Sequence, residues 1–412
     1  MKIVILTETF GKNMSYLGSM LPKYLVRGGA DVHVLTLELS PYYYMKDYQD
    51  TYSKFNRQTD LIDCPVEVYD GYTIHTLPHK KLFGYVYMKG ELKKLRELSP
   101  DIVYSLTAIG WLPLIAALAR PIIGYKLFTG SHTTASTFPM AHKKIPIWNK
   151  ERLKCFFMRF IPGRIVSLAS EKCYGPTKDC AEIAWRFFGV QRRKVEVLHL
   201  GVDTDYFFPV NSSILLNERM RLRSELGFCK DEIVCVYSGK MTEVKNAVIL
   251  AKAIDRLRSE GYPYRGLFIG DGVQKEEIAR HDSCVVLDFM PYQSLARYYR
   301  AADIGVWPTN ESTSTLDAAA CGLPLVVSDG IVYREHVEGN GLVCKMNNLE
   351  DLVNTLHAYL DPKTRKQLGD AGALKMARHF SWESVAKRRL GDFGVALNSR
   401  KHIDSVRDQT RG

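Results

Sequence analysis

The sequence predicts an α/β fold built on two doubly wound parallel sheets. Three observations lead to this class. The chain opens on an apolar strand, MKIVILTETF, which a glycine-containing loop and an amphipathic segment follow. A second start of the same kind, EIVCVYSGKM, lies at residues 232–241. The length of 412 residues is enough for two good-sized cores, at roughly 150 residues per domain.

In the N-terminal half, strand and helix patterns alternate. After the loop at 11–18, residues 20–27 form an amphipathic stretch that ends at a pair of glycines, and 30–39 has the pattern of a second strand. Further along come the strand DIVYSLTA, a helix at 111–119 and the strand IIGYKLFTG. Strands separated by helical crossovers pair in parallel, so this half is predicted to be a βαβ sheet.

The C-terminal half repeats the alternation after its first strand. A helix is predicted at 247–257, and three more strands lie in the segments GLFIGDG, CVVLDFM and DIGVWP. A polar segment at 209–226 is expected to join the halves. We expect an N-terminal Rossmann-like domain at 1–205 and a C-terminal Rossmann-like domain at 206–385. Residues 386–412 are expected to form a helix that packs back on the first domain and ends in a frayed tail.

The stretch WPTNESTSTLDAAACGLPLVVSDG, residues 307–330, is the most informative part of the chain. A strand end leads into a hydroxyl-rich turn, a small-residue helix and another strand. A helix start presents unpaired N–H groups and a partial positive charge, which favours phosphate. The pattern predicts a phosphate-binding element at the carboxyl end of a parallel sheet. The alternative is a helix start that Ser and Thr merely cap.

This stretch resembles the signature of family-4 retaining glycosyltransferases, which joins an acid and a Gly-Phe-Gly turn to a Glu-Ala-x-Ala-x-Gly-x-Pro helix. The helix half, DAAACGLP, matches with Asp317 in place of Glu. The turn is shorter, and an ungapped alignment would put Thr309 rather than Glu311 at the first acid. The resemblance continues through KVEVLHLGVDTDYFFP, VYSGKMTEVKN, FMPYQSLARYYRAADI, NGLVCK and HFSWESVA.

The resemblance implies the GT-B architecture, two Rossmann-like domains facing across a cleft, with an acceptor-binding N-terminal domain at 1–205 and a nucleotide-sugar-binding C-terminal domain at 206–385. It also implies transfer of a hexose, with retention, from a UDP- or GDP-linked sugar to a hydroxyl acceptor. No metal or other cofactor is expected, because Lys240 and Lys245 would neutralise the leaving diphosphate while Gly239 keeps the loop open. Lys240 stands where the family has Arg, and a lysine cannot bind a phosphate in the bidentate geometry of a guanidinium. Backbone groups would therefore contribute more to orienting the phosphate.

The remaining site residues are assigned by the same resemblance. Asp317 would accept hydrogen bonds from the ribose hydroxyls. Glu311 would lie nearest the donor sugar, and His132 would hydrogen-bond that sugar as a neutral imidazole. The backbone at Phe289 and Met290 would contact the nucleobase. The hydroxyl and N–H groups of Ser314 and Thr315 would hold the second phosphate. Gly18 would allow the backbone of the loop 13–18 to approach the donor closely.

Composition limits the partners. Residues 1–210 carry 28 Lys and Arg against 19 acids, whereas residues 211–412 carry 28 against 26, so an anionic partner is expected on the N-terminal half. Residues 142–164 interleave basic and aromatic side chains, and residues 79–89 have the same character. We expect these segments to contact an anionic membrane surface and the acceptor to be a glycan or lipid-linked precursor. The alternative is that the aromatics are core and the lysines a solvated rim.

Other function classes are less well supported. No nucleic-acid motif accompanies the charge, and no Gly-x-Gly-x-x-Gly follows either first strand. Nine scattered cysteines without a C-x-x-C pair, and the lack of a spanning apolar run, favour a cytoplasmic protein, peripheral on the inner face of the membrane. No metal-ligand spacing is present. Two alternatives stay open: a nucleotide-sugar epimerase of the same fold, and a non-catalytic sugar-nucleotide-binding scaffold.

Overall fold

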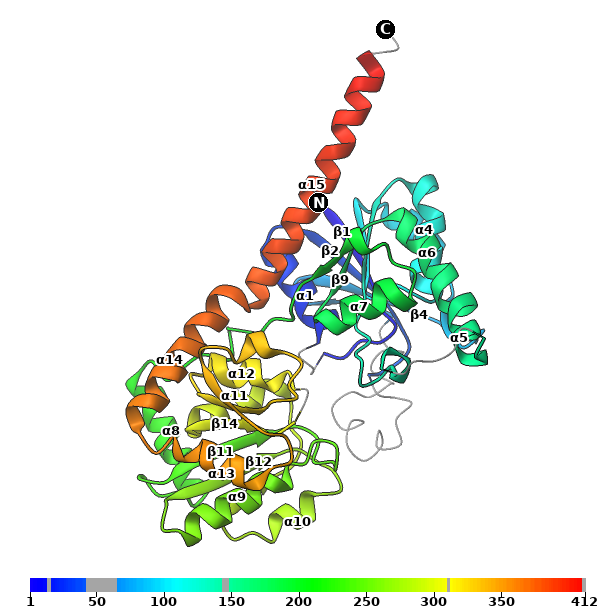
Figure 1. Ribbon diagram of the computed structural model, residues 1–412. Coiled ribbons are helices and arrows are strands. Elements are labelled where there is room, and N and C mark those ends of the chain that lie inside the picture. Colours follow the sequence, from blue (N-terminus) through cyan, green and yellow to red (C-terminus); the bar gives the residue numbers. More distant parts are fainter. Residues whose placement is uncertain (13–15, 42–64, 143–147, 310–311, 410–412) are drawn as a thin grey trace. The chain divides into compact units, whose positions relative to one another are not determined.

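The computed structural model describes residues 1–12, 16–41, 65–142, 148–309 and 312–409. Two compact units make up the chain (Figure 1). Unit 1 comprises Met1–Leu200 with the C-terminal segment from Trp382, and unit 2 comprises Gly201–Ser381. These junctions lie slightly before the ones expected at 205/206 and 385/386. At the junctions the Val202 amide donates to the Phe380 carbonyl at 2.7 Å, so the two ends of unit 2 lie side by side.

Unit 1 contains an eight-stranded sheet in the order β10-β9-β8-β7-β1-β2-β4-β3, parallel except for the β3–β4 pair. Its strands are β1 (Lys2–Leu6), β2 (Asp31–Leu37), β3 (Val66–Tyr69), β4 (Tyr72–Leu77), β7 (Ile102–Ser105), β8 (Lys126–Gly130), β9 (Ser170–Gly175) and β10 (Val195–Val197). The strand order reverses between β1 and β7. A doubly wound sheet binds its ligands at such a point, at the carboxyl ends of the strands.

Helices cover both faces of this sheet. On one side α3 and α6 pack on α4, and on the other α1 packs against α15. The helices of unit 1 are α1 (Leu17–Arg27), α3 (Glu91–Leu98), α4 (Trp111–Ile123), α5 (Lys150–Cys155), α6 (Ile161–Ala169), α7 (Lys178–Phe187) and α15 (Trp382–Gln409), with short turns η2 (Pro139–Ala141) and η4 (Arg192–Lys194).

Successive side chains of a strand point to opposite faces of the sheet, so each strand contributes to the core under both helix layers. Val103 and Leu127 belong to the cluster that α3, α4 and α6 cover. Their neighbours Tyr104 and Phe128 point the other way, where both rings contact Phe393 of α15 at centroid distances of 6.3 and 4.6 Å. The continuous apolar strands of the sequence thus follow from burial on both faces.

Unit 2 contains a smaller doubly wound sheet. It is entirely parallel, with the strand order β13-β12-β11-β14-β15-β16. Its strands are β11 (Ile233–Ser238), β12 (Tyr264–Ile269), β13 (Cys284–Leu287), β14 (Ile304–Trp307), β15 (Leu325–Ser328) and β16 (Gly341–Cys344). Its helices are α8 (Ser213–Glu225), α9 (Val248–Ser259), α10 (Lys275–Ala279), α11 (Tyr292–Ala301), α12 (Ser314–Ala320), α13 (Leu349–His357) and α14 (Pro362–His379), with the turn η5 (Arg334–His336). The predicted fold class, with two Rossmann-like parallel sheets, is confirmed.

The polar segment 209–226, predicted to be a junction, is instead mostly helix α8 of unit 2. The Ser212 side chain caps it by accepting from the Leu215 amide. Arg219 and Arg223 of α8 both pair with Asp303, at 2.6 and 3.0 Å. The arginines therefore anchor a helix, although their density in the sequence is typical of an exposed linker.

The two basic-aromatic segments of unit 1 form surface elements. Residues 79–89 fold into an antiparallel hairpin of β5 (His79–Leu82) and β6 (Tyr85–Met88). Of residues 142–164, the part from 148 on forms α5, a π-helical turn η3 (Phe156–Phe160) and the start of α6. The carbonyl of Phe188 approaches Gly163 so closely that a Cβ there would lie 1.9 Å from its oxygen, which fixes α6 against the end of α7.

Candidate active site

The sequence-predicted residues of unit 2 gather at one edge of its sheet. Lys240 and Lys245 follow β11, Phe289 and Met290 follow β13, and Ser314 lies in the first turn of α12 after β14. In this parallel sheet the carboxyl ends of these strands share one edge. The strand order reverses between β11 and β14, and the lysine loop and α12 flank that point. It is the position that doubly wound folds use for ligands.

The lysine loop lies on the glycine turn that follows β12. A Cβ on Gly270 would lie 2.0 Å from the Gly239 carbonyl oxygen, so only glycine permits this contact. The Met241 amide donates to the Asp271 carbonyl at 2.8 Å, and the Tyr237 hydroxyl donates to the Lys240 carbonyl at 2.7 Å. The Gly-Asp-Gly turn thus supports the backbone that carries the two lysines.

Both lysine side chains are half-buried in this loop. Two ammonium groups at the carboxyl edge of a sheet provide a positive potential for a diphosphate, and partial burial strengthens it by lowering the local dielectric constant.

The start of α12 is built differently from a plain capped helix. The Thr313 side chain makes no capping hydrogen bond. Thr315 is fully buried, and its hydroxyl donates to the Ser312 carbonyl at 2.8 Å, so in this structure it closes the turn. The Ser314 side chain is half-buried. Of the two residues predicted to hold the second phosphate, Ser314 is therefore the more accessible.

Asp317 lies one turn further into α12, with 8 % of its surface exposed. Burial raises its pKa well above the usual range, and the nearby Asp203 carboxylate adds to the shift. A carboxyl in these surroundings gains from any hydrogen-bond donor that stabilises its ionised form. Two ribose hydroxyls would be such donors, as the sequence predicts.

Glu311 lies outside the described residues, as do Asn13 to Ser15 of the N-terminal loop. Thr309, the other residue that aligns with the family's first acid, is 1 % exposed, and its carbonyl accepts from the Ser328 hydroxyl at 2.9 Å. The shortened turn is thus fixed where it leaves β14. Glu311 stays a prediction.

In unit 1, His132 follows β8 at the carboxyl edge of the sheet. His132 as a whole residue is exposed to solvent. Desolvation by the surrounding protein nevertheless lowers the pKa of His132 to about 4, and repulsion from the Arg389 guanidinium adds to the effect. The ring is therefore neutral near pH 7 and can donate or accept a hydrogen bond, which is the state predicted from the sequence.

Gly18 differs locally from the prediction. The sequence places it in a loop before a helix at 20–27, but α1 begins at Leu17, so Gly18 lies in its first turn. A Cβ there would lie 3.5 Å from Leu106 Cδ1 and 3.8 Å from Thr7 Oγ1, which are ordinary contacts. Gly18 thus reaches the reversal point between β1 and β7, and its close approach to a donor stays a prediction.

Sequence reasoning missed Glu8, which follows β1 at the same reversal point. Its carboxyl is half-buried, and burial raises its pKa. A Cβ placed on Gly110 would lie 3.9 Å from Glu8 Oε1 and 3.2 Å from Tyr85 Cδ1. The available signal was the one used for His132, a titratable residue directly after a buried strand.

Two features concern metals and membranes. Within the described ranges, no three His, Cys, Asp or Glu side chains lie together as a metal site would require. Nor does any helix there combine the length and apolar character needed to cross a membrane.

Comparison with known proteins identifies the family of this chain. Residues 20–206 match the family model described as Glycosyltransferase Family 4, and residues 232–361 match that of Glycosyl transferases group 1. The chain belongs to the GT-B glycosyltransferases.

Curated relatives of this glycosyltransferase include two described as D-inositol 3-phosphate glycosyltransferase. The one from Mycobacteroides abscessus is 27 % identical over 370 residues, which cover 83 % of this chain and 80 % of the relative. The one from Streptomyces bingchenggensis is 27 % identical over 260 residues, or 58 % of this chain and 56 % of the relative. The chain thus matches little more than half the length of some of these relatives.

Among solved structures, HepE from Anabaena in complex with UDP aligns with a TM-score of 0.68 at 14 % identity, over 96 % of this chain and 100 % of that one. The same protein has been solved with UDP-glucose, and aligns with a TM-score of 0.64 at 15 % identity, over 97 % and 99 %. At this identity the likeness concerns the fold.

Proposed function

We propose that this glycosyltransferase transfers a hexose from a UDP- or GDP-linked sugar to a hydroxyl acceptor, with retention at the anomeric carbon. The observation that supports this most is the set of side chains at the edge of unit 2. Two half-buried lysines, a helix start and a buried carboxyl flank the reversal point of the sheet. HepE, which shares the fold, was solved with UDP and UDP-glucose.

In this mechanism Lys240 and Lys245 stabilise the negative charge that develops on the leaving diphosphate. The step needs no metal, because the two ammonium groups supply the charge. Asp317 orients the nucleotide through its ribose, and the backbone near Phe289 and Met290 reads the base. No carboxylate nucleophile is assigned for a double displacement, so we propose attack of the acceptor hydroxyl from the side of the leaving phosphate, which takes up the proton.

A thermal-shift panel of nucleoside diphosphates and their sugars, with and without EDTA, tests the donor site. We expect one base to stabilise the protein, and EDTA to leave that shift unchanged. Proton NMR of the product then reports the anomeric configuration. An epimerase would interconvert the sugar nucleotide without an acceptor, and a scaffold would bind it without turnover. Either result would contradict the transferase proposal.

We also propose that the acceptor is lipid-linked and that unit 1 binds an anionic membrane surface. The supporting observation is the exposure of aromatic side chains on the basic segment around α5. Trp148, Phe156 and Phe157 expose 84, 45 and 61 % of their surface, although core aromatics would be covered. Aromatic and basic side chains together favour an anionic lipid interface.

Vesicle flotation tests the membrane proposal. The full chain should float with anionic vesicles and much less with neutral ones, and Phe157→Asp should reduce flotation. Ile214→Asp, at a position on α8 of unit 2 that is 78 % exposed, is the matched control. Flotation with neither kind of vesicle would exclude membrane binding through this surface.

A further inference from the structure

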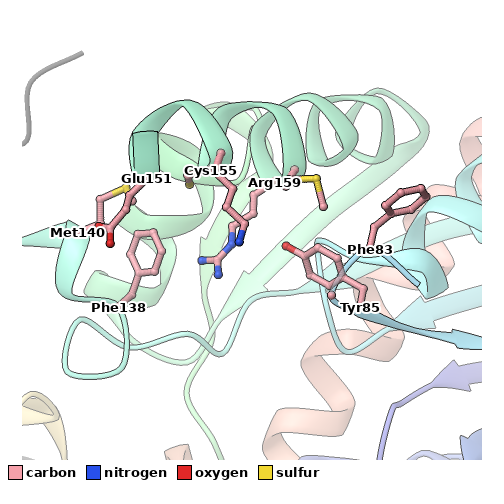
Figure 2. A pocket seen from close by; sticks show the side chains of 10 residues that line it. Phe83, Tyr85, Phe138, Met140, Glu151, Cys155 and Arg159 are labelled. Atoms are coloured by element: carbon pink, nitrogen blue, oxygen red, sulfur yellow. The ribbon is translucent and has the colours of Figure 1, made fainter. Parts of the chain in front are cut away.

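Unit 1 carries a pocket that the assigned site residues do not line. The pocket has a volume of about 510 Å³ and lies between the β5–β6 hairpin, the turn η2 and the helical segment α5–η3. Figure 2 shows the Arg159 guanidinium directed into it, with Phe138 on one side and Tyr85 on the other. We call it the cationic pocket, because Lys154 and Arg159 line it.

The cationic pocket continues into an apolar groove. Phe83, Tyr85 and Met158 also line a second cavity of about 180 Å³, together with Trp111, Leu114 and Phe157. Trp111 in turn borders a third cavity of about 720 Å³, which Ile115, Leu118 and Ile122 of α4 help to line. These two cavities form what we call the apolar groove. Each cavity shares at least one lining residue with the next, so the three lie side by side along this surface, and we call them together the track.

The hairpin turn shapes the junction between pocket and groove. Phe83 adopts a left-handed conformation, φ 50°, followed by Gly84 at 79°. Such a conformation costs of order 1 kcal/mol or more for a residue with a Cβ, yet it leaves the Phe83 ring 71 % exposed. The Trp111 indole N–H donates to the Leu82 carbonyl at 3.0 Å and holds the turn on α4. The fold therefore fixes an exposed aromatic wall at this point.

The charge at one end of the track is not neutralised by the protein. Arg159 stacks over the rings of Phe138 and Phe188, at 5.2 and 5.7 Å from their centroids. No carboxylate of the described residues forms an ion pair with Arg159 or Lys154, although Glu151 lies at the same pocket. The guanidinium is thus held by aromatic faces and by a hydrogen bond with Tyr85, and its remaining N–H groups can serve an anion.

The groove itself stays apolar despite a buried acid. Glu91 lines it with 1 % of its surface exposed, and neither carboxyl oxygen has a hydrogen-bond partner. Burial raises the pKa of Glu91 well above its usual range, which favours the uncharged form of the side chain. Lys93, Arg96 and Glu97 also line the third cavity, and all three are exposed to solvent.

We propose that the acceptor is an amphiphile whose phosphate-type head binds Arg159 and Lys154 while its hydrocarbon chain lies along Trp111, Leu118 and Ile122. This inference rests on the proposed transfer to a lipid-linked acceptor and assigns it a place. The cationic pocket lies next to the apolar groove, and an amphiphile matches both. A partner helix would leave the cations without a counter-charge. Tyr85 and Gly110 line the second cavity, and next to them lies Glu8 at the carboxyl end of β1. The junction between pocket and groove therefore lies beside the edge that doubly wound sheets use for ligands.

Calorimetric titration of the full chain with alkyl phosphates below their micelle concentration tests the assignment. The probes are decyl phosphate, octyl phosphate, decyl maltoside with a neutral head, and inorganic phosphate with no chain. We expect decyl phosphate to bind at least tenfold more tightly than the last two. Each added methylene buried in the groove should raise the affinity about fourfold.

Variants at the two ends of the track should separate head from chain. Lys154→Gln, at an exposed position, should lower the affinity for decyl phosphate and leave the affinity for decyl maltoside unchanged. Ile122→Asp should weaken every alkyl ligand. Ile214→Asp is the control, because both isoleucines are exposed on helices, at 68 and 78 %. Arg159→Lys, which keeps the charge, should bind less well than wild type if the planar guanidinium is used.

The other outcomes overturn specific parts of the account. Equal binding of all probes, or of none, while nucleotide sugars still stabilise the protein, would overturn the groove and leave the proposed transfer standing. Dimerisation that Ile122→Asp abolishes, without alkyl phosphate binding, would make the groove an interface between copies of this chain. Decyl phosphate binding in a chain that no nucleotide sugar stabilises would remove the acceptor role and the proposed function together.

Discussion

At the scale of single residues, Asp317 carries a strong electrostatic signature. Burial and the Asp203 carboxylate raise its pKa, so the free protein favours the protonated form over a wider pH range than an exposed aspartate would. Ribose hydroxyls would stabilise the ionised form, and nucleotide binding should then release a proton.

This coupling predicts that affinity for the nucleoside diphosphate rises with pH. The increase should approach about tenfold per pH unit below the pKa of the free protein. Calorimetric titrations over a series of pH values, corrected for the ionisation of the diphosphate itself, would measure it. Asp317→Asn should bind weakly and without this dependence. A pH-independent wild-type affinity would mean that the carboxyl does not ionise on binding.

Lys245 provides a second prediction at this scale. Lys245→Met should lower the affinity for the nucleoside diphosphate about 10- to 100-fold, because a hydrogen bond to a charged group contributes roughly 1.5–3 kcal/mol. Lys230→Met, at an exposed position of the same unit, is the control. Equal affinities of the two variants would remove Lys245 from the phosphate site.

Glu91 provides a prediction on stability. Its pKa is raised in the folded protein above the ordinary value of 4.5, so its contribution to stability is present below that pH and is lost as the pH rises. Glu91→Gln should therefore raise the melting temperature near neutral pH, and the gain should shrink in acid. In the same helix, a hydrogen bond from Lys94 lowers the pKa of Glu97, so Glu97→Gln should not stabilise at neutral pH.

Whether the sequence identifies a site residue depends on the local pattern around that residue. His132, Lys240 and Lys245 directly follow apolar strands, and a parallel sheet brings such positions to one edge. Arg159 had no such mark, because it lies on a π-helical turn and owes its place to Phe138 and Phe188. Glu91 is a charged residue at a helix start in the sequence, and only tertiary packing buries it.

At the scale of elements, α8 shows how polar composition misleads. Arg223 is 3 % exposed, pairs with Asp303 and donates to the carbonyls of Ala301, Cys229 and Glu232. Asp303 in turn accepts from the Val234 amide of β11 at 2.8 Å. The helix is therefore fastened to the first strand of unit 2 through charged groups, which a reading based on apolar periodicity cannot detect.

Removing this anchor should be costly. Asp303→Ala leaves a buried guanidinium without its counter-charge, and we expect a loss of about 3–5 kcal/mol in the free energy of unfolding. Glu225→Ala breaks the Arg221–Glu225 pair of the same helix, whose side chains are 74 and 58 % exposed, and should cost less than about 1 kcal/mol. Urea denaturation of both variants would compare them. Equal losses would contradict the anchoring role of α8.

At the scale of the whole molecule, each unit has its own reversal point and its own set of polar side chains. Unit 2 carries lysines, a buried acid and a helix start, which suit a nucleotide sugar. Unit 1 carries a neutral histidine, a half-buried glutamate and a track that is cationic at one end and apolar at the other. The alternation of strands and helices predicts both sheets, because burial on both faces leaves continuous apolar strands in the sequence. The track joins a hairpin, α4 and α5–η3, and no local pattern encodes that junction.

The most direct test of the account is turnover in a single tube. The full chain is incubated with UDP- or GDP-hexoses and anionic vesicles that contain a prenyl phosphate-linked sugar, and both nucleoside diphosphate release and lipid mass are followed. The account predicts release from one donor class together with a gain of one hexose on the lipid, and loss of both in Lys245→Met. Release of nucleotide without any lipid product, or a fully active Lys245→Met variant, would contradict it.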